Sequence, residues 1–319
     1  MTPLLAAPAD SLGVPQFLNP ESIMSTQKST GTDLHQEITN QVIAAIEAGT
    51  EKFDLPWHKV GPNLSIPVNA TTGKAYNGIN ILALWSANLK HGFTENRWAT
   101  YRQWQGVEAQ VVKGQRSTGI LFCKPLVCDE EKTSDDKEHV RWMSRRASVF
   151  NLAQTDGYEP PVLDLANQVE PCDAAEALIR ATGAKVENQG DRAFYSPTID
   201  SITIPPRNQF KATSNCTASE AYYSTLLHEL VHWTGAEQRL DRPQSNGFRT
   251  PEYAFEELVA ELGAAFLCAE LGISLSPKPE NAAYCANWLK LLKDDSRALT
   301  RAASQASKAV AYLKDLAGY

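Results

Sequence analysis

The sequence predicts an α+β protein with two domains, the second of which holds a metal-binding helix. Three features lead to this expectation. The chain has 319 residues, which is enough for two domains that each bury a hydrophobic core. Short helical and strand-like segments alternate along its first half, whereas longer helical patterns fill its second half. The second half also contains His228-Glu229-Leu230-Val231-His232, whose spacing is typical of a metal site on a helix.

The composition is that of a soluble globular protein. Hydrophobic residues make up 43% of the chain and charged residues 21%. There is no run of about 18 apolar residues, as a membrane span would need, and the first 24 residues lack the basic start of a secretory signal. The six cysteines are scattered without a C-x-x-C pair, which argues against a disulfide framework or a cysteine zinc site. We therefore expect a cytoplasmic protein that makes no membrane contact.

The first half of the chain is expected to form an α+β domain over residues 25–157, after a flexible leader over residues 1–24. The leader is rich in Ala and Pro, and Met24 could be the native start. Thr100 can cap a helical turn, and the acidic residues 129–138 would form a solvated hairpin tip. The other expected elements are helices over residues 32–49 and 79–89, and strands over residues 110–113, 119–127 and 140–152.

The second half begins after a proline-rich linker at residues 158–171, so we expect a domain over residues 172–319. It would start with a helix over residues 174–182, followed by a hairpin of residues 192–196 and 201–204. This hairpin could pair with an extended peptide beside the metal-binding helix, as many peptidases hold their substrates. Plain sheet scaffolding explains the hairpin equally well.

The metal-binding helix has clear start and stop signals. Thr217 and Glu220 form a T-x-x-E capping box at its start, and Gly235 suits its C-terminal cap. Residues four apart lie one turn above each other on a helix. His228 and His232 therefore project from one face and can bind one metal ion.

Glu229 follows the first of these histidines and is placed to take a proton from a metal-bound water and to deliver it to a leaving amine. The alternative is a buried histidine pair that is satisfied by backbone carbonyls. In that case Glu229 would be an unpaired buried acid, which is costly. The sequence thus favours a peptidase centre with two imidazole ligands, one general base and an open coordination position.

Two histidines leave a metal ion under-coordinated, so the next helix is expected to supply a carboxylate. This helix starts at Thr250 and ends before Gly272. Glu257 and Glu261 share one of its faces, and we expect Glu257 to be the third ligand and Glu261 to orient a histidine. Small residues nearby would let the two helices approach closely. Tyr253 lies on the same face and could either stabilise an oxyanion or simply pack.

The other acids of this helix, Glu252 and Glu256, fit a solvated face, because Glu256 points about 100° away from Glu257. The solvated-face interpretation is also the alternative for Glu257 itself. A site of two histidines and one carboxylate favours zinc as the divalent metal, but the same ligands accept manganese, cobalt or nickel. Residues 280–316 are expected to form helices that cover the back of the site.

Positive charge is concentrated in one part of a chain whose formal net charge is −7. Residues 62–125 contain seven basic and two acidic side chains, a net charge of +5, so the rest of the chain carries −12. An anionic ligand would therefore be drawn to this part of the chain alone.

Several motifs resemble those of the ArdC antirestriction proteins. Residues 228–235, 239–242, 253–261 and 287–295, which read HELVHWTG, RLDR, YAFEELVAE and NWLKLLKDD, resemble the C-terminal metallopeptidase domain of this family. Residues 69–80, 98–104 and 113–116, which read NATTGKAYNGIN, WATYRQW and KGQR, resemble its N-terminal domain, which is also similar to the N-terminal part of certain plasmid primases. The resemblance covers nearly the whole chain after Met24.

This resemblance implies a plasmid-borne protein that binds single-stranded DNA and helps DNA entering by conjugation to escape host restriction. It also implies a zincin-like peptidase domain, similar to the SprT-like proteases that digest proteins crosslinked to DNA. It does not identify the protein or peptide substrate. Nor does it imply that proteolysis is needed for antirestriction.

The residues of the basic region support DNA binding independently, because single strands bind to basic grooves interleaved with aromatic platforms. A tryptophan in a small domain more often belongs to the core, and we assign Trp85 to the core. The residues expected to contact DNA are Lys74, Arg97, Arg102, Lys113, Arg116 and Lys124 at phosphates, Tyr76 and Trp98 by stacking, and Asn80 as a polar contact.

Three functions remain open from the sequence. The first is a metallopeptidase that single-stranded DNA brings to its protein substrates. The second is a DNA coat protein whose peptidase domain is not needed for protection. The third is a peptidase whose basic domain binds protein rather than DNA.

Overall fold

The computed structural model of the protein describes residues 33–49, 57, 65–126, 141–159, 171–213, 216–243, 250–275 and 281–319. The predicted leader, the predicted acidic hairpin tip and most of the predicted linker lie outside these residues. Residues Asp33–Tyr319 group into one compact unit. Among the described residues, the structure has no helix that is both long and apolar enough to cross a membrane.

The first half of the chain mixes helices and strands, as predicted. Its strands are β1 (Val68–Asn69), β2 (Arg97–Ala99), β3 (Gln110–Val111), β4 (Thr118–Leu126), β5 (Arg141–Asn151) and β6 (Thr155–Asp156). A four-stranded sheet has the order β1-β2-β5-β4, in which β1 and β2 are parallel and the other neighbours antiparallel. β4 and β5 form a long ladder that runs from the pair Thr118–Val149 to the pair Leu126–Arg141. β3 and β6 form a separate pair.

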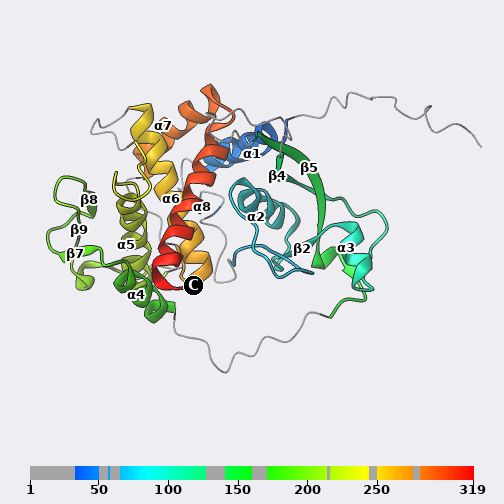
Figure 1. Cartoon of the computed structure of the whole chain (residues 1–319), viewed down its shortest axis with the longest axis horizontal. Coiled ribbons are helices and arrows are strands. Elements are labelled where there is room, and N and C mark those ends of the chain that lie inside the picture. Colours follow the sequence, from blue (N-terminus) through cyan, green and yellow to red (C-terminus); the bar gives the residue numbers. More distant parts are fainter. Residues whose placement is uncertain are drawn as a thin grey trace, which may run out of the picture. The chain divides into compact units, whose positions relative to one another are not determined.

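The described residues of this part form three α-helices, namely α1 (Leu34–Gly49), α2 (Ile79–His91) and α3 (Tyr101–Gly106). α3 begins after Thr100, whose hydroxyl accepts a hydrogen bond from the Gln103 N–H in a capping box, which confirms the predicted cap. α2 covers one face of the sheet (Figure 1), where Leu84 packs in a cluster with Ile120 and Val149.

Two residues expected to contact DNA are instead part of this packing. Trp98 is 0% exposed and lies in the same cluster as Leu84. Asn80 on α2 donates from Nδ2 to Leu121 O (2.8 Å) and accepts at Oδ1 from Leu121 N–H (2.8 Å). Its amide takes the place of a neighbouring strand at the outer edge of β4. The predictions that Trp98 stacks on a base and that Asn80 contacts DNA are therefore wrong.

The second half of the chain contains a small sheet and five α-helices in its described part. The elements are α4 (Pro171–Thr182), β7 (Lys185–Asn188), β8 (Phe194–Ser196), β9 (Ser201–Ile204), α5 (Ala218–Thr234), α6 (Pro251–Leu271), α7 (Asn281–Asp294) and α8 (Ala298–Ala317). The sheet has the order β7-β9-β8, with β8 antiparallel to β9, so the predicted hairpin is confirmed. β7 runs parallel to β9 and was not predicted, because its polar segment shows no alternation.

Helix α6 is largely buried and packs against both α5 and α8 (Figure 1). A Cβ added at Gly263 would lie 2.8 Å from Val231 Cγ2 of α5, so the close approach of the two helices requires glycine here. This confirms the predicted close packing. Trp85 of α2 meets Phe266 of α6 with 5.8 Å between their ring centroids, and both belong to the main core. The assignment of Trp85 to the core is therefore confirmed.

The Asn80 bridge predicts a loss of stability on substitution. Asn80→Ala should lower the free energy of unfolding by about 2 kcal/mol, because it leaves the Leu121 N–H and C=O without these partners. Urea denaturation measures this change, with Asn77→Ala as the control because Asn77 is exposed. If Asn80→Ala is as stable as the wild type but binds DNA more weakly, Asn80 contacts DNA after all.

Candidate metal centre

The helix α5 presents the two histidines as the sequence predicts. Thr217 accepts a hydrogen bond from Glu220 N–H, and the Glu220 side chain returns to the backbone of Thr217, so the predicted capping box is confirmed. His228 and His232 lie one turn apart, with 4.9 Å between their ring centroids. A helix that starts at a fixed residue and stays regular through both histidines sets their spacing without help from other elements.

Glu257 of α6 completes a cluster with the two histidines. His228 Nε2 lies 3.5 Å from one carboxylate oxygen of Glu257, and His232 Nε2 lies 3.6 Å from the other. One potential ligand atom from each of the three residues lies within 4.8 Å of the others. Two imidazole nitrogens and one carboxylate are the donor set of a catalytic zinc site. The residues therefore fit a divalent metal ion.

Two more carboxylates stand behind the histidines. His228 Nδ1 lies 3.6 Å from Glu261 Oε2, and His232 Nδ1 lies 3.2 Å from Glu256 Oε1. In each ring the Nε2 side faces Glu257 and the Nδ1 side faces one of these outer acids. Carboxylates at this position fix the tautomer and orientation of metal-binding histidines. This is the placement expected of Glu261, but not of Glu256.

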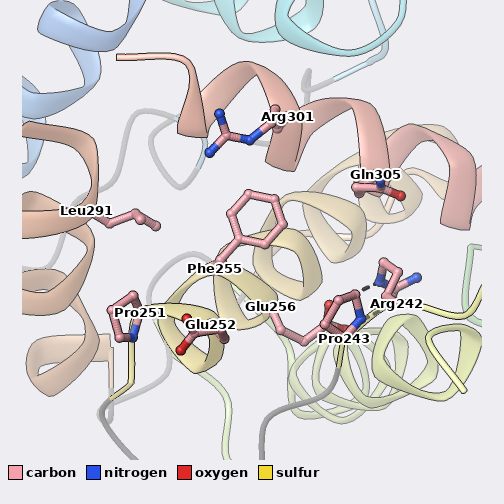
Figure 2. A pocket seen from close by; sticks show the side chains of 9 residues that line it. All are labelled: Arg242, Pro243, Pro251, Glu252, Phe255, Glu256, Leu291, Arg301 and Gln305. Atoms are coloured by element: carbon pink, nitrogen blue, oxygen red, sulfur yellow. Dashed lines mark hydrogen bonds and ion pairs between the residues drawn. The ribbon is translucent and has the colours of Figure 1, made fainter. Parts of the chain in front are cut away.

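The prediction that Glu256 lies on a solvated face is wrong. Glu256 is only 6% exposed, and it forms a bidentate pair with the guanidinium of Arg242, at 3.0 Å from Nε to Oε2 and 2.8 Å from Nη2 to Oε1. Arg242 also donates to Val231 O (2.7 Å) and Thr234 Oγ1 (2.8 Å) of α5. Arg242 and Glu256 lie together at the wall of a pocket of about 280 Å³ (Figure 2). The neighbouring Glu252 is exposed, as predicted.

The electrostatics of the site keep the acids ionised. Burial alone would raise the pKa of Glu257, but a hydrogen bond with His228, Coulomb attraction to both histidines and a hydrogen bond from Tyr253 lower it to about 2. Burial likewise opposes ionisation of Glu256, whereas His232 and Arg242 bring its pKa below the usual value. Both carboxylates are therefore charged at neutral pH, which is the state that binds a cation. Tyr253 lies at Glu257, as its shared helix face predicts.

Glu229 lies beside the small sheet. It is buried, and its Oε2 accepts a hydrogen bond from the backbone N–H of Tyr195 (3.1 Å). Tyr195 belongs to β8, the edge strand of its sheet. The general base predicted from the sequence is thus next to a strand that could pair with an extended chain.

The residues predicted to contact DNA have different environments in the structure. Arg97 is half-buried and paired with Glu95 at 3.0 Å. Tyr76 is half-buried, and its hydroxyl donates to Trp98 O (3.3 Å). Burial raises the pKa of Tyr76, although a hydrogen bond from Asn69 opposes this shift. The side chain of Lys124 lies outside the described residues. The exposed members of the set are Lys74, Arg102, Lys113 and Arg116.

Sequence reasoning missed four exposed side chains in the same half of the chain. They are Tyr101, Phe122, Arg145 and Arg146. Tyr101 and Phe122 are 41% and 57% exposed, which composition alone cannot reveal. The arginine doublet in a predicted strand was the available signal, because adjacent residues of a strand point to opposite faces, so each face of this strand carries one arginine.

Comparisons with known families assign both halves of the chain. Residues 173–305 match a family of zincin-like metallopeptidases, and residues 32–150 match the N-terminal domain of anti-restriction factor ArdC. The uncharacterized protein y4eC of Sinorhizobium fredii (strain NBRC 101917 / NGR234) is 39% identical over 292 residues, which cover 89% of this chain and 93% of that relative. A DNA primase TraC of Escherichia coli is 38% identical, but the match covers 86% of this chain and only 19% of the primase.

Solved structures match over nearly the same length. The metal-free structure of the antirestriction ArdC protein from the R388 plasmid has a TM-score of 0.73 and 36% sequence identity, and the match covers 90% of this chain and 98% of that chain. The Mn(II)-bound structure of the same protein has a TM-score of 0.71 and 35% identity, with the same coverage.

The support of His232 by Glu256 predicts a graded loss of metal affinity. Glu256→Gln should weaken zinc binding by about 10- to 100-fold. The neutral amide of glutamine lacks the negative charge that Arg242 keeps beside the His232 ring. Competition against a fluorescent zinc chelator measures the affinity. Glu252→Gln is the matched control, since Glu252 is exposed on the same helix. Equal affinities of the two variants would remove Glu256 from the metal site.

Proposed function

Because the chain belongs to the ArdC family of antirestriction proteins, we propose that it binds single-stranded DNA, carries an active metallopeptidase centre and protects DNA entering by conjugation from host restriction. The proposed peptidase activity is supported by one observation, namely that His228, His232 and Glu257 converge next to Glu229. Family membership supports the antirestriction part. A protein or peptide is the proposed substrate.

The proposed mechanism assigns one role to each of these side chains. His228 and His232 would hold the metal ion through Nε2, and Glu257 through its carboxylate. The bound ion supplies a Lewis acid and a water of lowered pKa. The carboxylate of Glu229 would accept a proton from the attacking water and deliver it to the leaving amine. Tyr253, which hydrogen-bonds Glu257, is a candidate to stabilise the oxyanion.

Zinc is the proposed metal, and manganese, cobalt or nickel are alternatives with the same ligands. The Mn(II)-bound structure of the related R388 protein supports a divalent cation in this family. A substrate chain would lie along β8, whose outer edge faces Glu229 through the Tyr195 N–H. Main-chain hydrogen bonds to an edge strand hold an extended peptide without demanding a particular sequence.

The proposed DNA surface lies on one face of β5. Arg146, Ser148 and Phe150 alternate along this strand, so their side chains share that face, and Ser148 pairs with Gly119 of β4. A Cβ added at Gly119 would lie 2.8 Å from the Arg146 guanidinium, so this guanidinium lies flat over the glycine. Between Arg146 and Phe150 this face carries the small residues Ser148 and Gly119, and Arg146 also pairs with Glu37 of α1 at 3.3 Å.

Tyr101 stands at one end of this face. Its ring meets Phe150 edge to face, with 6.4 Å between centroids, and it remains 41% exposed. Arg102 follows it on α3, and Arg116 lies just before β4, both exposed. Exposed aromatic rings flanked by arginines are the usual platform for bases and phosphates of a single strand. We therefore place base stacking at Tyr101, instead of at Tyr76 and Trp98.

The DNA part of the proposal predicts a specific loss at Tyr101. Tyr101→Ala should weaken binding of a labelled single-stranded oligonucleotide by about 5- to 100-fold, the equivalent of one stacked base, whereas Tyr101→Phe should bind normally. Fluorescence anisotropy at several salt concentrations measures both affinity and its expected decrease with salt. Tyr319→Ala is the matched control, because Tyr319 is also exposed (67%) but lies at the end of the chain. Salt-independent binding, or none, would favour a basic domain that binds protein.

The peptidase part predicts a separable loss at Glu229. Glu229→Gln should reduce hydrolysis of a denatured protein in the presence of DNA and zinc by more than about 100-fold, because a neutral amide cannot take the proton. Zinc stoichiometry and DNA affinity should be unchanged. Glu237→Gln, an exposed neighbour after α5, serves as the control. If this inactive protein still protects conjugating DNA from restriction, the coat function is the correct one.

A further inference from the structure

The segment that follows the metal-binding helix folds back onto its C-terminal end. Leu240 N–H donates to Thr234 O (3.0 Å), and Arg242 N–H donates to Gly235 O (3.0 Å). This return brings the side chain of Arg239 against α5, where its guanidinium carbon lies 3.9 Å from the centroid of the Trp233 ring. The Arg239 side chain is only 7% exposed. A stacked and buried guanidinium of this kind is held in one position.

The other side of the same guanidinium binds the β8–β9 turn. Arg239 donates from Nη1 to Asp200 Oδ2 (3.1 Å) and from Nη2 to both Asp200 Oδ1 and the Tyr195 hydroxyl (3.0 Å to the latter). The Tyr195 hydroxyl in turn donates to Asp200 Oδ1 (2.8 Å). We call Arg239, Asp200 and Tyr195 the hairpin clasp. Asp200 has a positive φ of 47°, which an aspartate adopts at some cost when its surroundings fix it.

Tyr195 connects this clasp to the active site. Its hydroxyl is part of the clasp, while its backbone N–H donates to Glu229 Oε2 at 3.1 Å. β8 is an edge strand of only three residues, from Phe194 to Ser196. A pairing this short is not stable by itself, so other contacts must hold β8 in place. The hairpin clasp supplies those contacts on the side of the strand that faces α5.

The charge states of the clasp residues do not change around neutral pH. Hydrogen bonds from Arg239 keep the pKa of Asp200 below its usual value, although burial opposes this. Burial and the hydrogen bond to Asp200 raise the pKa of Tyr195 to about 12. The clasp is therefore an ion pair with a neutral phenol at neutral pH.

We propose that Arg239 is a positioning residue of the metallopeptidase centre. Through Asp200 and Tyr195, Arg239 holds strand β8 in place. In this position the Tyr195 N–H meets Glu229, and the outer edge of β8 can receive a peptide. This inference rests on the proposed peptidase function. It adds a residue that neither binds the metal ion nor touches the reacting atoms. Loss of the clasp would leave the metal ligands in place but would free β8 from the general base.

The experiment compares two arginines that each pair with an acid and lie over an aromatic ring. Arg239→Met keeps an apolar stem against Trp233 and removes the guanidinium. Arg207→Met is the matched control, because Arg207 also pairs with an acid, Glu176 (2.8 Å), and lies 4.8 Å from the ring centroid of Tyr222. Asp200→Asn disrupts the clasp from its exposed side. It replaces Arg239→Met in the experiment if that variant does not fold.

Hydrogen–deuterium exchange of the full-length, zinc-loaded protein is the first measurement. In Arg239→Met, the peptide that contains the Tyr195 amide should exchange at least tenfold faster than in the wild type, with zinc stoichiometry unchanged and Arg207→Met like the wild type. The double variant with Asp200→Asn should show no further increase, because both changes break one unit. Unchanged exchange at Tyr195, or equal acceleration in Arg207→Met, would overturn the proposal.

Kinetics are the second measurement. For a peptide that the wild type hydrolyses, kcat/KM should fall by about tenfold or more in Arg239→Met, since small displacements of catalytic groups are costly. Arg207→Met should retain its activity. Accelerated exchange with unchanged kcat/KM would limit the clasp to structure and overturn its role in positioning. A wild-type protein without any hydrolytic activity would overturn the proposed peptidase function, and the exchange data would then still decide whether the clasp holds β8 at Glu229.

Discussion

The close packing of α6 on α5 is the constraint on which the metal centre depends. At Gly263 the two helices approach so closely that even a methyl group would meet Val231 at 2.8 Å. This approach brings Glu256, Glu257 and Glu261 of α6 to within reach of the histidines and leaves each of them at most 9% exposed. Buried carboxylates are unfavourable unless charge or hydrogen bonds compensate them. A helix pair that packs this well can hold acids in positions that an isolated helix would leave in water.

The compensation differs from one acid to the next. Glu256 is paired with Arg242 in two hydrogen bonds, so its charge is largely balanced before any metal binds. Glu257 faces the Nε2 atoms of His228 and His232 at 3.5 and 3.6 Å, so its charge is directed at the space where a cation fits. A divalent ion there would offset the cost of burying Glu257 and Glu229 together. Metal binding should therefore contribute to the stability of α5 and α6 as well as to chemistry.

How much of this could be predicted from the sequence depends on how local each feature is. The histidine spacing, the helix caps and the choice of Glu257 follow from helical periodicity, and the structure brings those residues together. The role of Glu256 could not be predicted, because its partner Arg242 comes from a turn after the previous helix. Asn80 and Trp98 were misassigned for a related reason. Only the packing of α2 against the sheet shows that the Asn80 amide bonds to the backbone of β4 and that Trp98 lies in a hydrophobic cluster. The sheet around β9 was half predicted, because the hairpin alternates in polarity and β7 does not.

The turn after α5 links the two sides of the centre. Within residues 235–242, Arg239 fixes the strand beside Glu229, and Arg242 fixes the acid behind His232. Both guanidiniums are also hydrogen-bonded to carbonyl groups in the last turns of α5, so neither can move without disturbing that helix end. Glu229 and His232 are thus held relative to the same short piece of backbone. A centre built in this way keeps its geometry even though its parts come from two helices and a sheet, because one turn positions the groups that support them.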